Sequence, residues 1–306
     1  MGFSAAWRHA RLILCCLCLT TLAGVLSLST ASAGEGRLQL SYRAYFADIR
    51  AGNLDLRVDF DAASYDPDAA AYDLDASAYA VRLRLKTSGL VKALTRLKTT
   101  AYSHGAFVSG EIVPVRAGYS SKRWRKKRLV ELGFNEGTPR VVRIKPRRKG
   151  GNPPSVAPAQ LKGALDPAGA LLAVLSRFDA GQGCRLRIPV YTGRRLYELV
   201  GEPHGTGVGR LKASRYSPFA GSTVNCRLRL ERKAGFKRRS GKGRDRPHTD
   251  VRLHMARVFG ETPPVPVRFA GETGYGSLVA YLHRAKLDAG GLKRELRPRP
   301  GRKRRR

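Results

Sequence analysis

The segment Leu54-Asp55-Leu56-Arg57-Val58-Asp59-Phe60 alternates apolar and charged side chains at every position. Because successive side chains of a β-strand point to opposite faces, this pattern predicts a strand with one buried face and one charged, solvated face. Strands of this kind are typical of antiparallel sheets that are wet on one side, so the segment predicts a mainly β protein. The same alternation recurs in five further segments, at residues 38–46, 79–85, 130–134, 251–255 and 265–269.

Turn signals punctuate these segments. Glycine is one of the residue types that supply the positive φ angles of tight hairpin turns. We therefore expect turns between strands at six glycine-containing segments: Ala51-Gly52-Asn53, His104-Gly105, Ser109-Gly110, Glu136-Gly137, Gly205 to Gly209 and Gly274 to Gly276.

Two segments have helical rather than strand periodicity. Asp166 is suited to cap a helix and Pro167 to begin one. We expect a main helix at approximately residues 166–179, with an antiparallel sheet packed around it. Its apolar face is formed by Leu171, Leu172, Leu175 and Phe178. A weaker pattern over residues 88–97 predicts a short helix with three leucines on one side, Leu90, Leu94 and Leu97.

Residues 1–33 have the pattern of a secretory signal peptide. A positively charged start precedes 17 uncharged residues, Leu12 to Leu28, and Ala31-Ser32-Ala33 supplies a small-x-small cleavage site. An uncleaved membrane anchor is the alternative, but the uncharged run is shorter than the about 20 residues that span a bilayer. We predict cleavage after Ala33 and export.

Cleavage would leave two of the five cysteines, Cys184 and Cys226. Both follow the apolar phase of an alternating segment, so both sulfurs are expected to face the same interior. An exported chain meets an oxidising compartment, where an even number of cysteines favours a disulfide; two buried free thiols are the alternative. We predict a structural Cys184–Cys226 bridge that ties the strand after the main helix to a later strand of the same sheet. Placement of the two cysteines on neighbouring strands would bring their Cβ atoms within bonding range.

The chain is strongly basic: its 306 residues include 58 Lys and Arg against 23 Asp and Glu, a net charge of +35. An apolar fraction of 42% is nevertheless enough for a folded core. We predict one domain over residues 34–287 and a disordered basic tail over 288–306, where apolar residues are scarce. A second basic cluster surrounds a tryptophan and gives the candidate anion-binding residues: Lys122, Arg123, Trp124, Arg125, Lys126, Lys127 and Arg128.

This cluster has two interpretations. Basic residues interleaved with an aromatic ring can bind phosphates or lie in a membrane headgroup layer, but they can also form a merely solvated hairpin face. For an exported protein the nearest polyanions are anionic lipid, lipopolysaccharide or a cell-wall polymer. An envelope protein is a further candidate partner, and nucleic acid is not an expected one.

Signatures of catalysis are absent from the sequence. The histidines show no HExxH spacing, no Gly-x-Ser-x-Gly elbow occurs, and the glycines at 205–209 are not followed by the Lys-Ser/Thr of a phosphate-binding loop. We therefore expect no cofactor, no metal site and no catalytic residues.

Four motifs occur in order within residues 38–284: Tyr42-x-x-Tyr45 with Ile49-x-Ala51-Gly52, Thr87-Ser88-Gly89-Leu90, Leu165-Asp166-Pro167, and Tyr191-Thr192-Gly193-Arg194-Arg195-Leu196-Tyr197 between the two cysteines. This order resembles the exported bacterial proteins of the domain of unknown function 3108 (DUF3108) family, and the two-cysteine form resembles its alphaproteobacterial branch. The family usually has Asp where this chain has Thr192. The resemblance implies a periplasmic protein with a curved, partly closed sheet, an open barrel similar to periplasmic lipid and lipoprotein carriers, and no established activity.

Three hypotheses for the function stay open at this point. The first is a non-enzymatic binding or structural role in the cell envelope, in which the concave apolar face could hold a lipid-like ligand unless the main helix fills it. The second is a polyanion or membrane-surface binder that acts through its basic loops and tail. The third, and least favoured, is an enzyme of unrecognised type.

Overall fold

The computed structural model describes residues 36–61, 77–146, 156–179, 183–236, 250–260, 262–273, 276–289 and 291–298. These residues all belong to one compact unit that begins at Gly34. The predicted signal peptide, residues 1–33, lies outside the described residues, as does the end of the predicted tail, residues 299–306. No helix of the described segments has the length and apolar character needed to cross a membrane.

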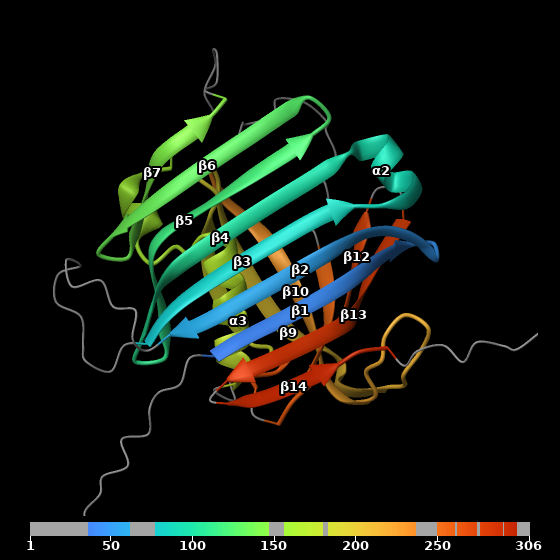
Figure 1. Ribbon diagram of the computed structural model, residues 1–306. Coiled ribbons are helices and arrows are strands. Elements are labelled where there is room, and N and C mark those ends of the chain that lie inside the picture. The colour runs from blue at the N-terminus through green and yellow to red at the C-terminus, as the bar shows by residue number, and fades with distance from the viewer. Residues whose placement is uncertain are drawn as a thin grey trace, which may run out of the picture. The chain divides into compact units, whose positions relative to one another are not determined.

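The first half of the chain forms consecutive antiparallel hairpins, with one short helix between the third and fourth strands (Figure 1). The alternation described above puts one side of each strand into the core. The elements are β1 (Gly36–Phe46), β2 (Ile49–Asp61), β3 (Ser77–Thr87), α2 (Gly89–Thr95), β4 (Leu97–Val108), β5 (Glu111–Arg123), β6 (Lys126–Asn135) and β7 (Thr138–Lys145).

The second half begins with helices and continues as a second series of hairpins. Its elements are the 3-10 turn η1 (Pro158–Leu161), α3 (Pro167–Asp179), β8 (Leu186–Tyr191), β9 (Leu196–Leu211), β10 (Gly221–Ala234), β11 (Asp250–Ala256), β12 (Val265–Thr273), β13 (Gly276–Ala289) and β14 (Leu292–Leu296).

The two series join into one 14-stranded sheet with the order β7-β6-β5-β4-β3-β2-β1-β13-β12-β11-β10-β9-β8. The junction is the antiparallel pairing of β1 with β13, in which Leu40 lies opposite Ala285. All named strand pairs are antiparallel, and β14 pairs with the second half of β13. The result is a nearly closed, barrel-like sheet, which confirms the predicted fold class.

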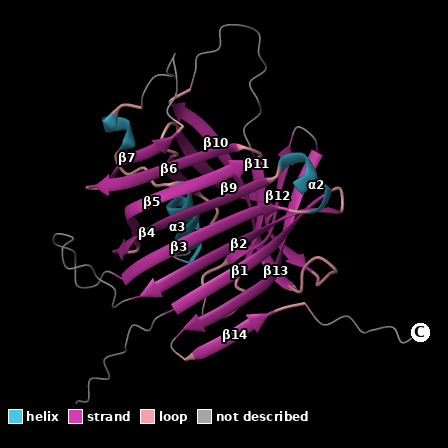
Figure 2. Ribbon diagram, turned by 45° about the horizontal axis from the view of Figure 1, so that its top comes forward, coloured by secondary structure: helices cyan, strands magenta, loops and turns pink. Residues whose placement is uncertain are grey.

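Helix α3 lies inside the curve of this sheet and contacts β3, β4, β5 and β8 (Figure 2). The prediction of a main helix at 166–179 is therefore confirmed. Its buried side chains join a continuous core with the inward residues of the strands: Ala168, Ala170, Leu172, Ala173, Val174, Leu175 and Phe178. Helix α3 therefore covers the concave face of the sheet. This arrangement agrees with the alternative in which the main helix, rather than a ligand, fills the curve.

A buried carboxylate anchors the start of α3 to the sheet. Asp166 is only 2% exposed, and its Oδ1 accepts hydrogen bonds from the backbone N–H groups of Ala168 at 2.8 Å and Gly169 at 3.1 Å. Its Oδ2 accepts a hydrogen bond of 2.7 Å from the hydroxyl of Ser103 in β4, which in turn lies 3.2 Å from the hydroxyl of Tyr79 in β3. Asp166 therefore caps the helix, as predicted, and also fixes its position on two strands.

The outer strands of the sheet, β7 and β8, form a seam that is closed without strand pairing in the described residues. The Gly163 N–H donates to the Gly137 carbonyl in the β6–β7 turn at 3.0 Å, while Leu165 forms a parallel bridge with Val190 of β8. A separate apolar cluster fills the space between these edges: Val130, Leu132, Leu161, Ala164, Tyr191 and Leu196. The barrel is therefore closed by packing and by one connecting segment.

The boundary predicted for the disordered tail, residues 288–306, is wrong. Strand β13 runs to Ala289, and β14 pairs with it between Leu292 and Leu296. The ordered pairing follows from a tight turn that includes Gly291, with φ of 81°, and from an ion pair of Arg284 with Glu295. The prediction took the many basic residues of this segment as a sign of disorder. An edge strand can nevertheless carry cations on its solvated side, because they do not enter the core.

Candidate functional site

The predicted anion-binding cluster forms the tip of the β5–β6 hairpin. Lys122 and Arg123 end β5, Trp124 and Arg125 form a two-residue turn, and β6 begins at Lys126. All seven residues of this basic hairpin, Lys122–Arg128, are exposed. Cross-strand neighbours pair like charges, with Lys122 opposite Lys127 and Arg123 opposite Lys126. Like charges directly opposite each other destabilise a hairpin, which suggests that the charge serves something other than folding.

Trp124 ties the tip of this hairpin to helix α2. Its indole N–H donates a 3.2 Å hydrogen bond to the carbonyl oxygen of Leu94, and the Arg96 guanidinium lies 4.9 Å from the centre of its ring. Its backbone has a φ of 53°, in the left-handed region that bulky residues rarely adopt. The turn therefore holds its tryptophan in one defined place beside α2.

A second basic site, which the sequence did not predict, lies at the seam of the sheet. It is a pocket of about 370 Å³ between β5–β7 on one side and the β8–β9 turn on the other, a size suited to a small ligand or headgroup. We call it the seam pocket, and the described residues that line it include four cations and no acid: Tyr119, Arg128, Val130, Ile144, Lys145, Pro146, Thr192, Arg194, Arg195 and Tyr197.

The backbone of the β8–β9 turn explains how two arginines reach the seam. Gly193 has a φ of 77°, and a Cβ at this position would lie 2.5 Å from Cγ1 of Val130. Only glycine therefore lets the turn approach β6 so closely. The Arg194 guanidinium donates a 2.6 Å hydrogen bond to the Pro146 carbonyl, so this side chain spans the seam from the β8–β9 turn toward the end of β7.

The polar groups of the seam pocket are mainly hydrogen-bond donors. Burial raises the pKa of the Tyr119 hydroxyl, although Arg128, Arg194 and Arg195 nearby oppose part of that effect. The hydroxyl therefore keeps its proton and is able to donate. Guanidinium groups, an ammonium group and a protonated hydroxyl converging on one space match the acceptor-only oxygens of a phosphate group.

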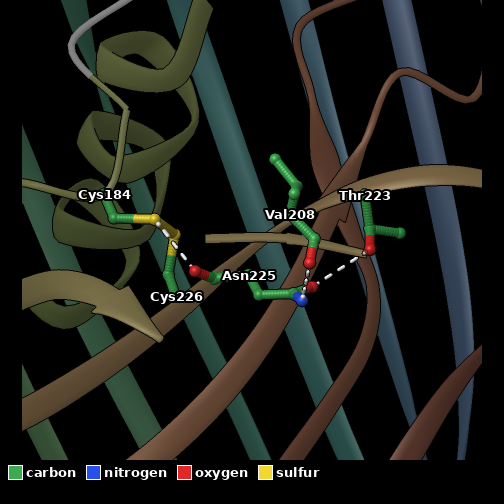
Figure 3. Close-up of a disulfide and its surroundings, with 5 residues drawn as sticks. All are labelled: Cys184, Val208, Thr223, Asn225 and Cys226. Carbon is green, nitrogen blue, oxygen red and sulfur yellow. Dashed lines mark hydrogen bonds between the residues drawn. A yellow bond between two sulfur atoms is a disulfide. The ribbon is translucent and has the colours of Figure 1, made fainter. Parts of the chain in front are cut away.

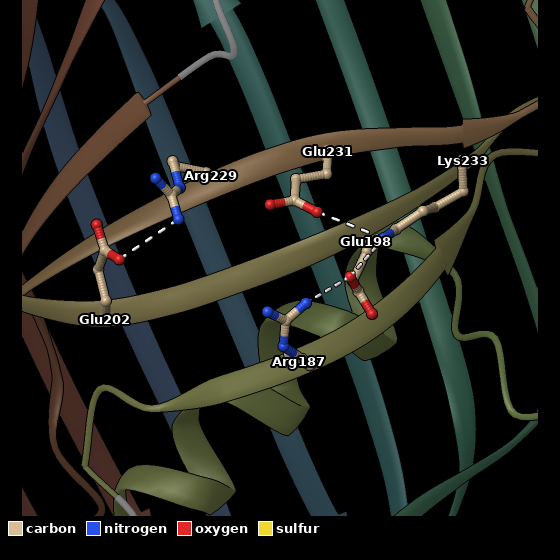
Figure 4. Close-up of polar contacts among 6 residues, drawn as sticks. All are labelled: Arg187, Glu198, Glu202, Arg229, Glu231 and Lys233. Atoms are coloured by element: carbon tan, nitrogen blue, oxygen red, sulfur yellow. Dashed lines mark hydrogen bonds and ion pairs between the residues drawn. The ribbon is translucent and has the colours of Figure 1, made fainter.

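The outer face of β8–β10 has a different charge pattern, because its acids and bases neutralise each other (Figure 4). Glu198 pairs with Lys233 at 2.7 Å and with Arg187 at 2.9 Å, and these partners lower the pKa of its carboxyl. Glu202 pairs with Arg229 at 3.4 Å. Within the described segments, by contrast, no Asp or Glu lies within ion-pair distance of the cations of the basic hairpin or of the seam pocket.

The predicted disulfide is present, with the Cα atoms of Cys184 and Cys226 5.5 Å apart (Figure 3). The expectation that it joins neighbouring strands is wrong, since Cys184 precedes β8, Cys226 lies in β10, and β9 runs between them. Cys226 lies opposite Pro203 of β9, and the backbone of Cys184 lies close to Gly201 of the same strand. A Cβ at Gly201 would lie 2.8 Å from Cγ of Leu186 and would also overlap the carbonyl oxygen of Cys184.

An irregularity of the sheet lies beside the bridge. The register between β9 and β10 shifts between Val224 and Cys226, which leaves extra β9 residues beside the bridge. The Asn225 side chain holds this segment, because its amide donates to the Val208 carbonyl at 2.9 Å and its Oδ1 accepts from Thr223 at 3.0 Å (Figure 3). The disulfide therefore fastens a part of the sheet where the ladder itself is interrupted.

Of the seven predicted anion-binding residues, the structure brings only Arg128 into the seam pocket. The other six stay at the hairpin tip. The residues that sequence reasoning missed come from three other segments: Tyr119, Lys145, Arg194, Arg195 and Tyr197. The adjacent arginines after Gly193, in a glycine turn that breaks the strand alternation, are the signal that could have found them.

Together these features define a disulfide-bonded β protein whose single, nearly closed sheet surrounds one helix and carries a donor-lined pocket at its seam. The model of the family described as "Protein of unknown function (DUF3108)" matches residues 41–283. The chain belongs to this family, as its motifs indicated. No curated protein matches it.

Among solved structures, the chain is similar to the crystal structure of a beta-barrel-like protein of domain of unknown function DUF1849 from Brucella abortus. The match has a TM-score of 0.40 and 11% sequence identity, and it covers 85% of this chain and 99% of the other.

Proposed function

We propose that this protein is an exported, non-enzymatic component of the bacterial cell envelope that binds phosphate groups of anionic envelope lipids in its seam pocket. The observation that carries this proposal is the convergence of Arg128, Lys145, Arg194 and Arg195 on one pocket with no acid among its described lining residues. Four cations without counter-ions repel one another, so an anion bound among them relieves that repulsion.

Export is supported by the N-terminal sequence and by the disulfide. The 33-residue leader pattern ends in a small-x-small site, and its removal would leave only the two cysteines that are bridged. Disulfides persist in oxidising compartments such as the periplasm. A surface role rather than enclosure of an acyl chain is supported by α3, whose side chains occupy the curve of the sheet.

The position of the pocket links binding to stability. Arg128 and Lys145 belong to one side of the seam, and Arg194 and Arg195 to the other. An anion that contacts both sides would cross-link edges that are otherwise held by packing, by one connecting segment and by the hydrogen bond of Arg194 to Pro146. Ligand that binds only the folded state raises the free energy of unfolding in proportion to the logarithm of its concentration.

We therefore expect inorganic phosphate to raise the melting temperature relative to sodium chloride of equal ionic strength, by roughly 3 °C at ten times the dissociation constant. The double variant Arg194→Gln/Arg195→Gln should lose this shift. The matched control Arg82→Gln/Arg84→Gln, which removes the same charge from exposed positions of β3, should keep it. Equal shifts in all three proteins would show that phosphate acts elsewhere.

Two sources of the phosphate are then compared with the same variants. Vesicles that contain phosphatidylglycerol present it in a phospholipid headgroup, whereas lipopolysaccharide presents it on a sugar. Loss of binding to one source only, in Arg194→Gln/Arg195→Gln, would name that source as the ligand. If neither binding is affected by the change, the seam pocket is not the lipid site.

A separate prediction concerns processing. Protein isolated from the envelope of its own bacterium should begin at Gly34 and should contain no free thiol, which N-terminal sequencing and thiol titration under denaturing conditions would check. A variant with a bulky residue at the cleavage site, Ala33→Leu, should retain the leader and serve as the control. Wild-type protein that still begins at Met1, or that titrates with two thiols, would contradict export.

A further inference from the structure

One end of the sheet exposes large apolar side chains. Helix α2 has no buried residue, and Leu90 and Leu94 are 67% and 73% exposed. Trp124 of the basic hairpin is 47% exposed and bonded to α2, and Ile49 at the start of β2 is 51% exposed. Figure 1 shows α2, the β1–β2 turn and the β5–β6 turn at this same end. We call these four side chains the apolar tip: Ile49, Leu90, Leu94 and Trp124.

This exposure is unusual for an amphipathic segment. The leucine spacing of α2 predicts a face that packs on the sheet, and burying a leucine stabilises a fold by about 1.5–3 kcal/mol. The helix instead adjoins β2 through its backbone, where the Ser88 N–H donates to the Ala51 carbonyl at 2.9 Å. Its leucines are thus left available for something outside the chain.

Cations surround the apolar tip. The exposed basic residues are Lys92 of α2, Arg96 directly after that helix, and Arg123, Arg125 and Lys126 from the hairpin. Asp48, the acidic residue of the neighbouring β1–β2 turn, is already paired, since it lies 3.8 Å from the Arg215 guanidinium and accepts a 2.8 Å hydrogen bond from Tyr216. An apolar centre with a basic rim complements a surface that is anionic outside and apolar beneath, which is the surface of a bilayer with anionic lipids.

Two residues at the apolar tip are also held in defined positions. Trp124 and Arg96 both have left-handed backbone angles, with φ of 53° and 44°, and their side chains stack on each other. Residues kept in such conformations are concentrated at functional sites. Because the indole N–H is already bonded to Leu94, the ring could enter the headgroup region without losing a hydrogen bond.

We propose that the apolar tip docks on a bilayer containing anionic lipids, with Leu90, Leu94 and Trp124 entering the boundary between headgroups and acyl chains and the rim cations contacting lipid phosphates. The inference rests on the proposed function in taking an anionic envelope lipid as the ligand, but its side chains differ from those of the seam pocket. It assigns the orientation of the molecule: this end of the sheet faces the membrane.

The test uses residues 34–306, which contain the whole compact unit and a single tryptophan, Trp124. Vesicles of phosphatidylglycerol with phosphatidylethanolamine should sediment the protein and shift Trp124 emission to the blue, and brominated acyl chains should quench it. Phosphatidylcholine vesicles should do neither. Each rim cation removed should weaken binding about fivefold, as in Arg123→Gln, Arg125→Gln and Lys126→Gln.

The double variant Leu90→Ser/Leu94→Ser should bind anionic vesicles at least tenfold more weakly at an unchanged melting temperature, because neither side chain is buried. The matched control is Val142→Ser/Val208→Ser, which alters two similarly exposed side chains, at 62% and 66%, on β7 and β9. Its vesicle binding should be unchanged.

The outcomes separate this inference from the proposed function. If phosphate raises the melting temperature through Arg194 and Arg195 but Trp124 emission does not change on anionic vesicles, docking by the tip is refuted and the seam pocket stands. If Trp124 is quenched in the lipid but phosphate has no effect, the seam pocket is refuted and the docking stands. Equal binding to neutral vesicles, or equal loss in the leucine and valine variants, would also overturn the docking proposal.

Discussion

Replacing Cys184 and Cys226 together by alanine is expected to lower the free energy of unfolding by about 4 kcal/mol. The bridge closes a chain segment with a sequence separation of 42, and the constraint on the unfolded chain grows with that length. It also fastens the start of β8 across β9, beside the register shift of β9 on β10. Urea denaturation of the oxidised wild type and of the variant would measure the difference.

Reduced wild-type protein is the matched control, because reduction breaks the same bond and leaves both side chains in place. It should unfold at nearly the urea concentration of the double alanine variant. If the variant and the reduced wild type both lost less than about 1 kcal/mol of unfolding free energy, the chain-entropy explanation of this bridge would be wrong.

Asp166→Ala is the second change with a large expected effect, a loss of about 3 kcal/mol of unfolding free energy. Loss of a helix cap costs about 1–2 kcal/mol, and loss of the charged acceptor of the buried Ser103 hydroxyl, which keeps only its contact with Tyr79, adds about 1–3 kcal/mol. Asp166→Asn keeps the oxygen that accepts from Ala168 and should lose less. Ser103→Ala removes only one of the three bonds and serves as the control; a loss equal to that of Asp166→Ala would contradict the capping role.

The protonation of Asp166 should also affect how the free energy of unfolding depends on pH. Burial raises the pKa of the Asp166 carboxyl, and its hydrogen bonds from Ser103, Gly169 and Ala168 oppose that rise only in part. The folded state therefore binds the proton more tightly than the unfolded chain, and the stability linked to it is lost as pH rises through the folded pKa. The unfolding free energy of wild type relative to Asp166→Asn should fall from about pH 4 upward. If this difference in unfolding free energy increased over that range instead, the pKa of Asp166 would be lowered by folding and not raised.

Strand alternation and the main helix could be read from sequence because both depend on local burial. Residues 54–60 and α3 lie where their periodicity predicts. Glycine was harder to interpret. Ser109-Gly110 and Glu136-Gly137 do form turns with positive φ, but Gly52 and Gly105 lie inside strands, and the turn expected at 205–209 lies within β9. A Cβ at Gly52 would be 2.7 Å from the Lys86 carbonyl oxygen, and one at Gly105 would overlap that of Val113. These glycines permit close approach of backbones, which no short motif reveals.

The candidate site was only half predictable. The basic hairpin is contiguous in sequence, whereas the seam pocket assembles Tyr119, Arg128, Lys145 and the turn at 192–197 from distant segments. The short helix was predicted over residues 88–97 and is present, but it ends at Thr95, so Leu97 begins β4 instead of joining the helical face. Its other two leucines, Leu90 and Leu94, are exposed rather than packed on the sheet. Periodicity shows that residues share a face, but only the tertiary arrangement shows what that face meets.

The pairing of β1 with β13 sets the order in which the molecule can be completed. Phe46 pairs with Leu278, which is 232 positions later in the chain. During synthesis, β1 can join β2 at once, but its other edge stays without a partner until nearly the entire polypeptide is available. Contacts this remote are slow to form, and open edges meanwhile invite association with other chains. A molecule interrupted before β13 would therefore consist of two hairpin arrays with no strand pairing between them. A chaperone that acts late in synthesis would have to protect the open edge of β1.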